Sequence, residues 1–413
     1  MAGGAEPGPR PPVALYLHVP FCRSICPYCD FVVVAGRAAT GPSNRVAAFV
    51  EALVAEVGLR ADMLEAAFGG PARRSPLTSV YLGGGTPSLL PAEAVARILE
   101  LVVERFGLAP DAEVTIEINP GSRERGDLDG FRRAGVGRLS IGAQSLRPDE
   151  LRRLGRRHRP EDVAQAVELA RASGFRSVSL DLLYDVPGQT EDDWRRTLDD
   201  ALALEPDHLS LYALTLDDPD AEGLTGEAGD HLPLRAGARR WRAGARAGQD
   251  DDRAAAMYEA ADVRLAGAGF AWYEISNWAR PGHESRHNLA YWRHEPYEAA
   301  GPGAHAFDGV VRRWNAAGLE AYVAALCPPE GRRPRLPAGG RERLDAATGS
   351  VERVILALRT ADGVALEAAT VPPLAGAVDW ALETGLLERD LSRLRLTTRG
   401  RLLSNELFAR LVA

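Results

Sequence analysis

Three of the four cysteines in the chain, Cys22, Cys26 and Cys29, lie within eight residues in the segment YLHVPFCRSICPYCDF. Three thiolates at this spacing can bind three corners of a 4Fe-4S cluster and leave the fourth iron with an open coordination position. A zinc site would need a fourth ligand such as His18, but zinc ligands usually come as pairs from two separated segments. A disulfide would leave an odd thiol. The spacing favours an iron–sulfur centre, with a zinc-stabilised binding module as the alternative.

The other reactive groups of the chain narrow its chemistry further. All 49 basic residues are arginine, because the sequence contains no lysine. Schiff-base, phosphate-loop and general-base lysines are therefore excluded. The net charge of -8 argues against a protein whose main task is to bind nucleic acid or anionic lipid.

The length of 413 residues predicts two domains, or one large domain with an appendage, at roughly 150 residues per domain. Residues 1–12 are rich in Gly and Pro and lack the pattern of a signal peptide, so we expect a disordered lead-in. No apolar run is long enough to cross a bilayer. These features predict a cytoplasmic protein.

From Val13 onward, short β-rich runs alternate with longer amphipathic stretches. The expected strands are 13–19, 77–83, 112–119, 137–144, 176–185 and 207–216, and examples of expected helices are 44–63, 91–106, 159–173 and 191–204. Such alternation predicts parallel βα units, in either an open sheet or a full or partial barrel. Barrels place their chemistry at the C-terminal ends of the strands.

Polar or glycine-rich residues follow these strands where a barrel would use them. Gly83, Gly84, Gly85, Thr86 and Pro87 follow the second strand, where missing side chains let the backbone approach a ligand. Later strand ends supply Glu117, Gln144, Asp181 and Thr215, with Arg156 between them. Each of these residues, taken alone, is equally well interpreted as a capping or surface residue. Together they predict a pocket for a charged, ribose-bearing cofactor.

The second half of the chain departs from the alternation. Residues 217–251 are acidic, then Gly-rich, then Arg-rich, and we interpret them as a solvated surface insertion, with an anion or partner patch around 235–246 as the alternative. Residues 252–326 contain a helix and an aromatic segment, and 327–340 resemble a linker. The remainder of 327–413 predicts a small winged-helix-like domain with a hairpin. The expected core then spans 13–250.

The motif CxxxCxxC, with Tyr28 before the last cysteine, resembles the radical S-adenosylmethionine (SAM) superfamily. This resemblance implies that the open iron binds the amino and carboxylate groups of SAM, which the reduced cluster can cleave to a 5'-deoxyadenosyl radical. It also implies that the glycine loop meets the methionyl amino group. The expected fold is therefore a partial (βα)6 barrel followed by a smaller C-terminal α+β domain.

The order of LYLHVPFCxxxCPYCDF, YLGGGTPS, EINP, RLSIGAQS, LGRRH and DLLYDVPGQT is similar to the coproporphyrinogen III oxidase-like branch of that superfamily. These motifs span most of residues 13–190. The resemblance, with the strand-end pattern, implies a SAM site made of Tyr16, Tyr28, Gly84, Gly85, Thr86, Glu117, Gln144, Arg156, Asp181 and Thr215.

Two features separate the oxidases of this branch from its heme chaperones, the HemW family. The oxidases carry a fourth cysteine two residues after the third, where this chain has Phe31, and a long N-terminal segment, where only about a dozen residues precede the first strand here. The HNxxYW signature of the chaperones is present as His287, Asn288, Tyr291 and Trp292. The chain therefore resembles the chaperones, and its status as an enzyme stays open.

The signature suits heme on chemical grounds. His287 offers an imidazole to iron, Tyr291 and Trp292 offer flat apolar faces, and Arg286 or Arg293 could meet propionates. The alternative iron ligands are His283, His294 and His305, and Cys327 is a further soft ligand. The competing interpretation is ordinary packing aromatics beside surface histidines.

The resemblance implies a heme chaperone with a 4Fe-4S cluster and SAM that delivers heme to apo-hemoproteins such as respiratory enzymes. From the same resemblance we also expect a homodimer that forms when the cluster is assembled and, at most, transient association with the membrane. The alternative is a radical SAM oxidoreductase acting on a tetrapyrrole, an oxygen-independent coproporphyrinogen III dehydrogenase.

Overall fold

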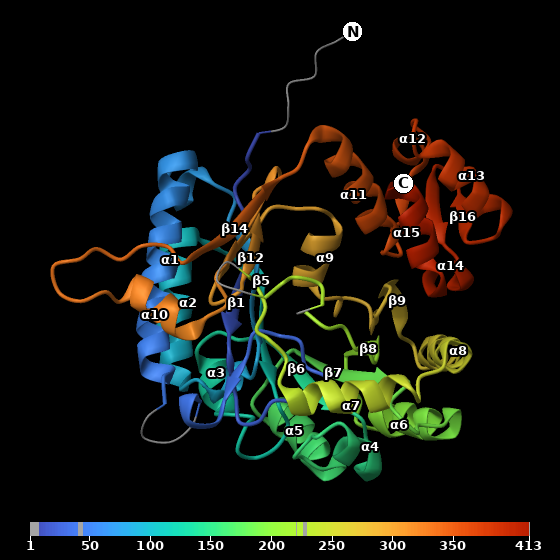
Figure 1. Ribbon diagram of the computed structural model, residues 1–413, viewed down its shortest axis with the longest axis horizontal. Coiled ribbons are helices and arrows are strands. Elements are labelled where there is room, and N and C mark those ends of the chain that lie inside the picture. The colour runs from blue at the N-terminus through green and yellow to red at the C-terminus, as the bar shows by residue number, and fades with distance from the viewer. Residues whose placement is uncertain (1–7, 40–43, 220, 226–228, 413) are drawn as a thin grey trace, which may run out of the picture.

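Six parallel strands form the centre of one twelve-stranded sheet in the computed structural model, which describes residues 8–39, 44–219, 221–225 and 229–412 (Figure 1). The six are β1 (Ala14–Val19), β4 (Leu77–Gly84), β5 (Leu108–Ile118), β6 (Arg138–Gln144), β7 (Ser177–Tyr184) and β8 (His208–Ala213). Each is hydrogen-bonded to the next in the parallel sense. The six strands expected from the sequence are thus confirmed, and with them the (βα)6 arrangement.

The sheet continues beyond these six strands at both edges, in the order β14-β13-β12-β11-β1-β4-β5-β6-β7-β8-β10-β9. The added strands are β9 (Ala271–Glu274), β10 (Asn277–Ala279), β11 (Tyr297–Ala300), β12 (His305–Phe307), β13 (Val311–Asn315) and β14 (Ala338–Arg343). The segment 252–326 therefore belongs to the same sheet as the core, and the stretch 327–340, expected as a linker, ends in an edge strand.

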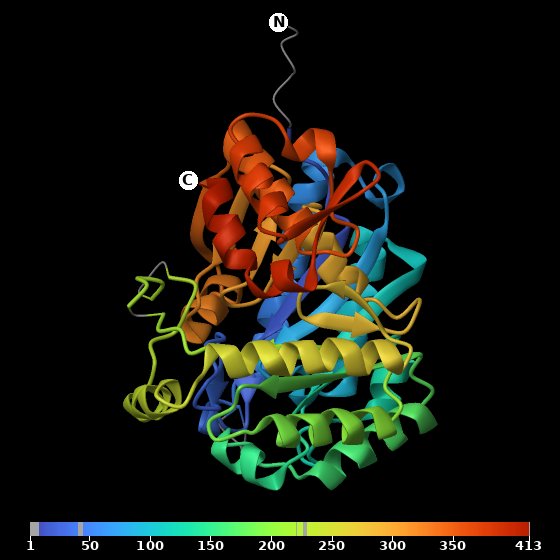
Figure 2. The same ribbon diagram turned by 90° about the vertical axis from the view of Figure 1, so that its right-hand side faces the viewer.

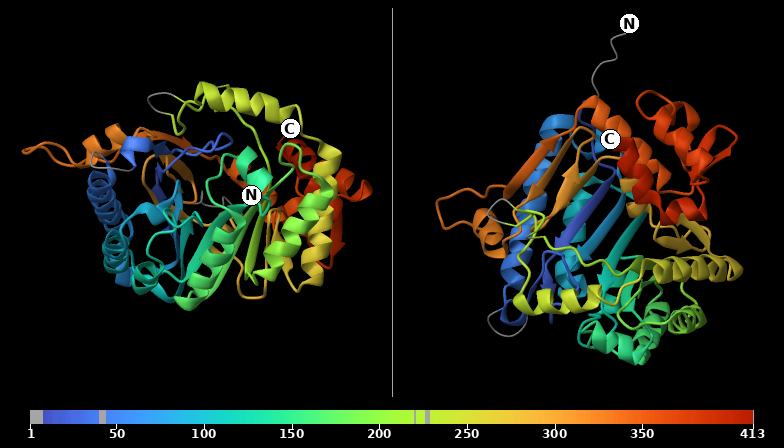
Figure 3. Two further views of the ribbon diagram at one scale, coloured as in Figure 1. Left: turned by 90° about the horizontal axis from the view of Figure 1, so that it is seen from below. Right: turned by 45° about the vertical axis from the view of Figure 1, so that its right-hand side comes forward.

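Helices cover the outer face of the curved sheet, as Figure 3 shows. Those between the six central strands are α1 (Val46–Phe68), α2 (Ala92–Phe106), α3 (Leu128–Arg133), α4 (Pro148–Arg153), α5 (Pro160–Ala172) and α6 (Glu191–Ala203), with short 3-10 turns η1 (Gly36–Ala38), η2 (Pro71–Arg73) and η3 (Pro87–Leu89). In α2 the buried residues are Val95, Ile98, Leu99, Val102 and Phe106, the spacing of one helix face.

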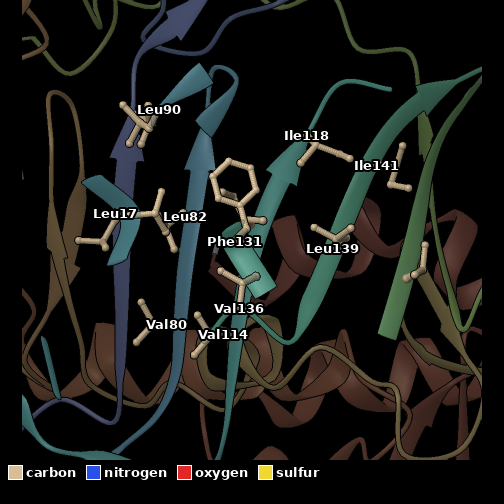
Figure 4. Close-up of a cluster of buried hydrophobic side chains, with 14 of the residues drawn as sticks. Leu17, Val80, Leu82, Leu90, Val114, Ile118, Phe131, Val136, Leu139 and Ile141 are labelled. Atoms are coloured by element: carbon tan, nitrogen blue, oxygen red, sulfur yellow. The ribbon is translucent and has the colours of Figure 1, made fainter. Parts of the chain in front are cut away.

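The main hydrophobic core lies between this helical layer and the outer face of the sheet. Leu17, Val80, Leu82, Val114 and Ile118 project from successive strands into it, as Figure 4 shows. Burial of each such side chain contributes about 1.5–3 kcal/mol relative to exposure. Alternate residues of each strand thus stabilise the fold by packing in this core.

The alternate residues of the same strands face the inside of the barrel and are mostly polar. Glu117 on β5, Ser140 on β6 and Asp181 on β7 line an internal cavity, as do Tyr16 on β1 and Tyr81 on β4. Closed (βα)8 barrels fill this space with branched apolar side chains. The inner face here is therefore built to surround a polar ligand.

The segment after β8 contains two helices, α7 (Ala236–Arg246) and α8 (Asp251–Gly267). Asp250 caps α8 by accepting a hydrogen bond from the backbone N–H of Arg253 over 2.9 Å. The Arg-rich part of the expected surface insertion is thus a helix. Residues 220 and 226–228 of that insertion, like residues 1–7 of the expected lead-in, lie outside the described residues.

Residues beyond β14 form a separate small domain that lies beside β9 and α8, as Figure 2 shows. Its elements are α11 (Ala346–Leu358), β15 (Val364–Ala365), α12 (Leu366–Ala369), α13 (Ala375–Glu383), β16 (Leu387–Asp390), β17 (Arg393–Leu396), α14 (Thr398–Leu402) and α15 (Ser404–Val412). The expected hairpin is β16–β17, within a sheet of order β15-β17-β16. The domain has its own core of buried apolar residues.

Two further elements complete the main body. The short helices α9 (Arg286–Trp292) and α10 (Leu319–Leu326) lie before β11 and after β13, and β2 (Phe21–Cys22) pairs with β3 (Val34–Ala35) around the cysteine loop. Within the described residues, none of the helices combines the length and the apolarity that crossing a membrane requires.

Candidate functional site

One cavity of about 900 Å³ joins the cysteine loop, the inner face of the barrel, helix α9 and the C-terminal domain. Its volume lies at the upper end of the range of about 300–1,000 Å³ that is common for small-molecule sites. Nearly all the residues expected to bind cofactors line it, namely Tyr16, Cys22, Cys26, Tyr28, Cys29, Gly84, Gly85, Glu117, Gln144, Arg156, Asp181, Thr215, His287, Asn288 and Tyr291. Thr86 and Trp292 are not part of its lining.

The cysteine loop carries donors directed at two of its sulfurs. Thr86 donates a hydrogen bond from Oγ1 to Sγ of Cys22, and Arg156 donates from Nη1 to Sγ of Cys26, both over 3.6 Å. Burial raises the pKa of the Cys22 thiol to about 11 and also raises that of Cys29. Without a bound cation these thiols stay protonated. Thr86 thus contacts the sulfur of Cys22 and does not line the cavity itself.

The glycine loop fits a group that must approach the backbone closely. Gly84 has φ +108°, and a Cβ there would lie 2.5 Å from the His18 ring. A Cβ at Gly85 would lie 2.7 Å from the carbonyl oxygen of Phe21, next to Cys22. A side chain at Gly84 would clash with His18 on β1, and one at Gly85 would clash with the start of the cysteine loop. The three thiols, their donors and this bare backbone fit a 4Fe-4S cluster with a bound SAM.

The zinc alternative fits the geometry less well. Both ring nitrogens of His18 are engaged, Nδ1 with the Tyr16 hydroxyl over 3.1 Å and Nε2 with the carbonyl oxygen of Val32 over 2.8 Å. The side chain is buried, which lowers the pKa of His18 to about 4.

Helix α7 holds the cysteine loop from outside. Arg242 is 4% exposed and donates from Nε to the carbonyl oxygen of Pro27 over 3.1 Å and from Nη2 to that of Tyr28 over 2.8 Å. Its Nη1 also donates to the carbonyl oxygen of Asp217. Trp241 donates to the carbonyl oxygen of Arg153 and packs against the Tyr28 ring. The Arg-rich stretch is therefore bonded to the loop between Cys26 and Cys29.

Two carboxyl groups lie inside the barrel with donors of their own. Glu117 accepts from the Tyr81 hydroxyl over 2.9 Å and from the backbone N–H of Gly84 over 3.0 Å. Asp181 accepts from Oγ of Ser140 over 3.0 Å. Burial, followed by the nearby Asp181, raises the pKa of Glu117 to about 7, and burial raises the pKa of Asp181. A cationic ligand would restore their negative charge.

Asn119 links the glycine loop to Arg156 and is a site residue that sequence reasoning missed. Its Nδ2 donates to Oγ1 of Thr86 over 3.0 Å, and its Oδ1 accepts from Nη2 of Arg156. Arg156 also donates to the carbonyl oxygen of Gly142 over 2.7 Å. The signal was available, since Asn119 directly follows the strand that carries Glu117 in the EINP motif.

The end of β6 has an unusual backbone conformation. Gln144 has φ 65°, in the left-handed region that non-glycine residues rarely occupy. A Cβ at Gly142 would lie 3.0 Å from Nε2 of Gln144 and 3.2 Å from Nη2 of Arg156. The Gln144 amide and the Arg156 guanidinium thus both lie close to Gly142 at the cavity wall, and the strained backbone of Gln144 is of the kind found at binding sites.

Helix α9 places His287 against the inner end of the barrel. The side chain is 1% exposed; its Nδ1 lies 3.0 Å from Oγ of Ser79 and its Nε2 lies 2.8 Å from the Tyr291 hydroxyl. Burial, followed by the charge of Arg138, lowers the pKa of His287 to about 3. The imidazole is therefore neutral, but both of its nitrogens are occupied. An incoming iron would have to displace Tyr291.

The remaining residues named for heme lie elsewhere. Trp292 packs under the guanidinium of Arg359, 4.4 Å from its ring centroid. Arg286 and Arg293 are half-exposed and pair with Asp111 and Asp362. The alternative ligands also lie outside the cavity lining, with His283 near Asp207, His294 against Phe307 and His305 bonded to Asp230. Cys327 is exposed at the end of α10.

Sequence reasoning also missed the wall contributed from inside the barrel and from the C-terminal domain. Arg138 on β6 and Arg359 and Arg401 of the small domain line the cavity, together with Ser404 and Asn405. Arg138 had a signal, as a charged residue at the second position of the expected strand 137–144. The others had none, because only the tertiary fold brings them to the site.

The curved sheet, the three-cysteine loop and the glycine loop define a radical SAM protein. Residues 16–201 match the Radical SAM superfamily model. The solved structure of coproporphyrinogen III oxidase (HemN) from Escherichia coli, described as a radical SAM enzyme, superimposes with a TM-score of 0.78 over 98% of this chain and 91% of that chain, at 22% identity. That likeness shows the fold, including the C-terminal domain.

Sequence relatives narrow the class. The heme chaperone HemW of Mycobacterium tuberculosis is 42% identical over 97% of this chain and 95% of its own length. Those of Bacillus subtilis and Escherichia coli are 31% and 37% identical over 95% and 71% of this chain, and over 97% and 70% of their own lengths. The chain belongs to the HemW family of the radical SAM superfamily.

Proposed function

We propose that this protein binds heme in the cavity and delivers it to apo-hemoproteins, in keeping with the name heme chaperone that its relatives carry. The observation that carries the proposal is the shared cavity. The HNxxYW motif contributes His287, Asn288 and Tyr291 to the lining of this cavity. The cysteine loop and the polar inner face of the barrel line the same cavity. Phe31, which stands where the oxidases have a fourth cysteine, is 60% exposed at the cavity mouth.

The family implies two resident cofactors, and the donor set fits both. We propose that Cys22, Cys26 and Cys29 bind the 4Fe-4S cluster. The SAM site would use Tyr16, Tyr28, Gly84, Gly85, Thr86, Glu117, Gln144, Arg156, Asp181 and Thr215, of which Thr86 acts through Cys22. The cluster supplies an electron for reductive cleavage of SAM. The chain's own residues exclude water, orient the ligand and neutralise its charges.

The heme site is proposed around His287, Asn288 and Tyr291, with Trp292 acting as the platform of Arg359. We further propose a cytoplasmic protein that contacts respiratory hemoproteins, with dimerisation on cluster assembly and transient contact with the membrane. These partner assignments rest on the family alone.

Titration of the purified protein with heme, followed at the Soret band, tests the proposal. We expect saturable binding that His287→Ala weakens and that His283→Ala, a histidine outside the cavity lining, leaves unchanged. Absence of saturable binding by the parent protein would refute the function.

The alternative is a radical SAM oxidoreductase acting on a tetrapyrrole, and the fold shared with HemN favours testing it directly. The reconstituted protein is incubated anaerobically with reductant, SAM and coproporphyrinogen III. Formation of protoporphyrinogen would support the enzyme, and heme binding without turnover would exclude it.

A further inference from the structure

Four arginines line the cavity, and two of them have no hydrogen-bonded acceptor. Arg156 is bonded to Asn119, Gly142 and Cys26, and Arg401 to Asp262 and Thr398. Within the described residues, the guanidinium groups of Arg138 and Arg359 form no hydrogen bond or ion pair, and Nε of each is enclosed without a partner. These two groups can therefore accept a new anion without breaking an existing bond.

The position of Arg138 makes the absence of a partner informative. The residue is 4% exposed, on the inner face of β6, and faces the cavity. Its nearest carboxylates are used elsewhere, since Glu113 accepts from the backbone N–H groups of Arg286 and His287, and Asp181 accepts from Ser140. A buried charge is costly unless it is paired. Glu113 balances the charge through space and leaves the donors of Arg138 free.

Arg359 approaches the same cavity from the C-terminal domain. Cζ of its guanidinium lies 4.4 Å from the ring centroid of Trp292, a cation–π contact that holds the group in place. Glu274 attracts it through space, but within the described residues the two side chains form no hydrogen bond or ion pair. Oε2 of Glu274 accepts from the backbone N–H of Ser276 over 3.3 Å, and its Oε1 is enclosed without a partner. A guanidinium held in place by an aromatic ring is pre-organised for binding a carboxylate.

We propose that Arg138 and Arg359 form a two-point carboxylate receptor that binds the two propionate groups of heme. The inference rests on the proposed function and assigns the side-chain end of the same ligand. The proposal also assigns a role to the tryptophan of the HNxxYW motif: Trp292 holds Arg359 in place rather than stacking on the macrocycle. Arg286 and Arg293, the receptors suggested by sequence alone, are already paired and lie outside the lining.

The test compares heme with its dimethyl ester, in which both carboxylates are blocked. We expect the parent protein to bind the free acid at least about tenfold more tightly than the ester, as charge-assisted hydrogen bonds predict. Arg359→Gln should remove most of that preference while leaving affinity for the ester unchanged. Arg293→Gln, exposed on α9 and paired with Asp362, is the matched control and should keep the full preference.

Arg138→Gln should act like Arg359→Gln, with a thermal melt recorded to confirm folding. If it does not fold, Arg359→Gln still decides the question. Equal affinity of the parent protein for both forms would overturn the receptor while leaving heme binding intact. Binding of neither form would refute the proposed function, and the receptor with it.

Discussion

Arg242 donates a hydrogen bond to the carbonyl oxygen of Tyr28 over 2.8 Å, which ties a helix more than two hundred residues away to the middle of the CxxC segment. The same guanidinium bonds to Pro27 and to Asp217. Backbone carbonyls between two cluster cysteines thus depend on one buried side chain. The helix does not provide a ligand; it fixes the loop from which the ligands come.

Arg242→Gln should therefore weaken cluster binding. The variant leaves three carbonyls short of donors, at a cost on the order of 2–3 kcal/mol, and frees the loop to move. After anaerobic reconstitution we expect less iron and sulfide per chain and a severalfold faster loss of absorbance near 400 nm in air. Arg240→Gln, exposed on the same helix, is the control. Equal cluster content and equal decay in both variants would contradict the role of Arg242.

Tyr291→Phe should strengthen heme binding if Nε2 of His287 is the iron ligand. The hydroxyl occupies that nitrogen over 2.8 Å, and because the pKa of His287 is lowered to about 3 the ring is already neutral. Removing the competitor should tighten binding by about two- to tenfold, the net worth of one hydrogen bond. A Soret titration measures this. Weaker binding by Tyr291→Phe, with no effect of His287→Ala, would exclude His287 as the ligand.

Affinity for SAM should rise with pH because Glu117 must ionise to attract a ligand that carries a sulfonium cation. With its pKa raised to about 7, the ionised fraction of Glu117 grows about fivefold between pH 6 and pH 7, while the charge of the sulfonium does not change. Isothermal titration should show a matching gain in affinity. Glu117→Gln should bind more weakly and without that pH dependence, and a pH-dependent Gln variant would assign the effect to another group.

The same carboxyl should affect the stability of the ligand-free protein in the opposite direction. Its folded pKa lies above the unfolded value of about 4.3, so the folded state holds a proton that the unfolded state releases. Its contribution to stability is full below about pH 4.3 and is lost as pH rises through about 7. Denaturant unfolding should show Glu117→Gln gaining stability relative to the parent between pH 5 and pH 8. A constant difference across that range would contradict the raised pKa.

The sequence predicted the six central strands because each combines a short β-rich run with the next amphipathic helix, and both signals are local. It also predicted that residues toward the ends of those strands would form a pocket, and Glu117 and Asp181 of that set line the cavity. It did not predict helix α7, because a stretch of Ala, Gly and Arg has the composition of a solvated surface. The burial of Arg242 arises only from contact with a loop near residue 27.

The residues of the HNxxYW motif also show that local sequence patterns do not predict contacts between distant segments. The spacing of His287 and Tyr291, four residues apart, does place them on one face of α9, where they meet. Trp292 is one residue further and therefore turns to the C-terminal domain. The sequence also could not show which arginine is free to bind a carboxylate, because the ion-pair partners are distant in sequence. Arg286 and Arg293, next to the motif, are paired with Asp111 and Asp362. The fold instead places Arg359 against Trp292.

Arg401 should hold the C-terminal domain against the barrel. Its side chain is 6% exposed and pairs with Asp262 of α8, while the guanidinium also lies 4.4 Å from the ring centroid of Trp272. Breaking a buried pair leaves an uncompensated charge, which costs about 3–5 kcal/mol. Arg401→Ala should therefore loosen the domain and expose the connection before α11 to limited proteolysis. Arg399→Ala, a neighbouring exposed arginine, is the control. If Arg401→Ala resists cleavage as well as the control does, the small domain is held by its other contacts, and the cavity wall that Arg359 provides does not depend on this ion pair.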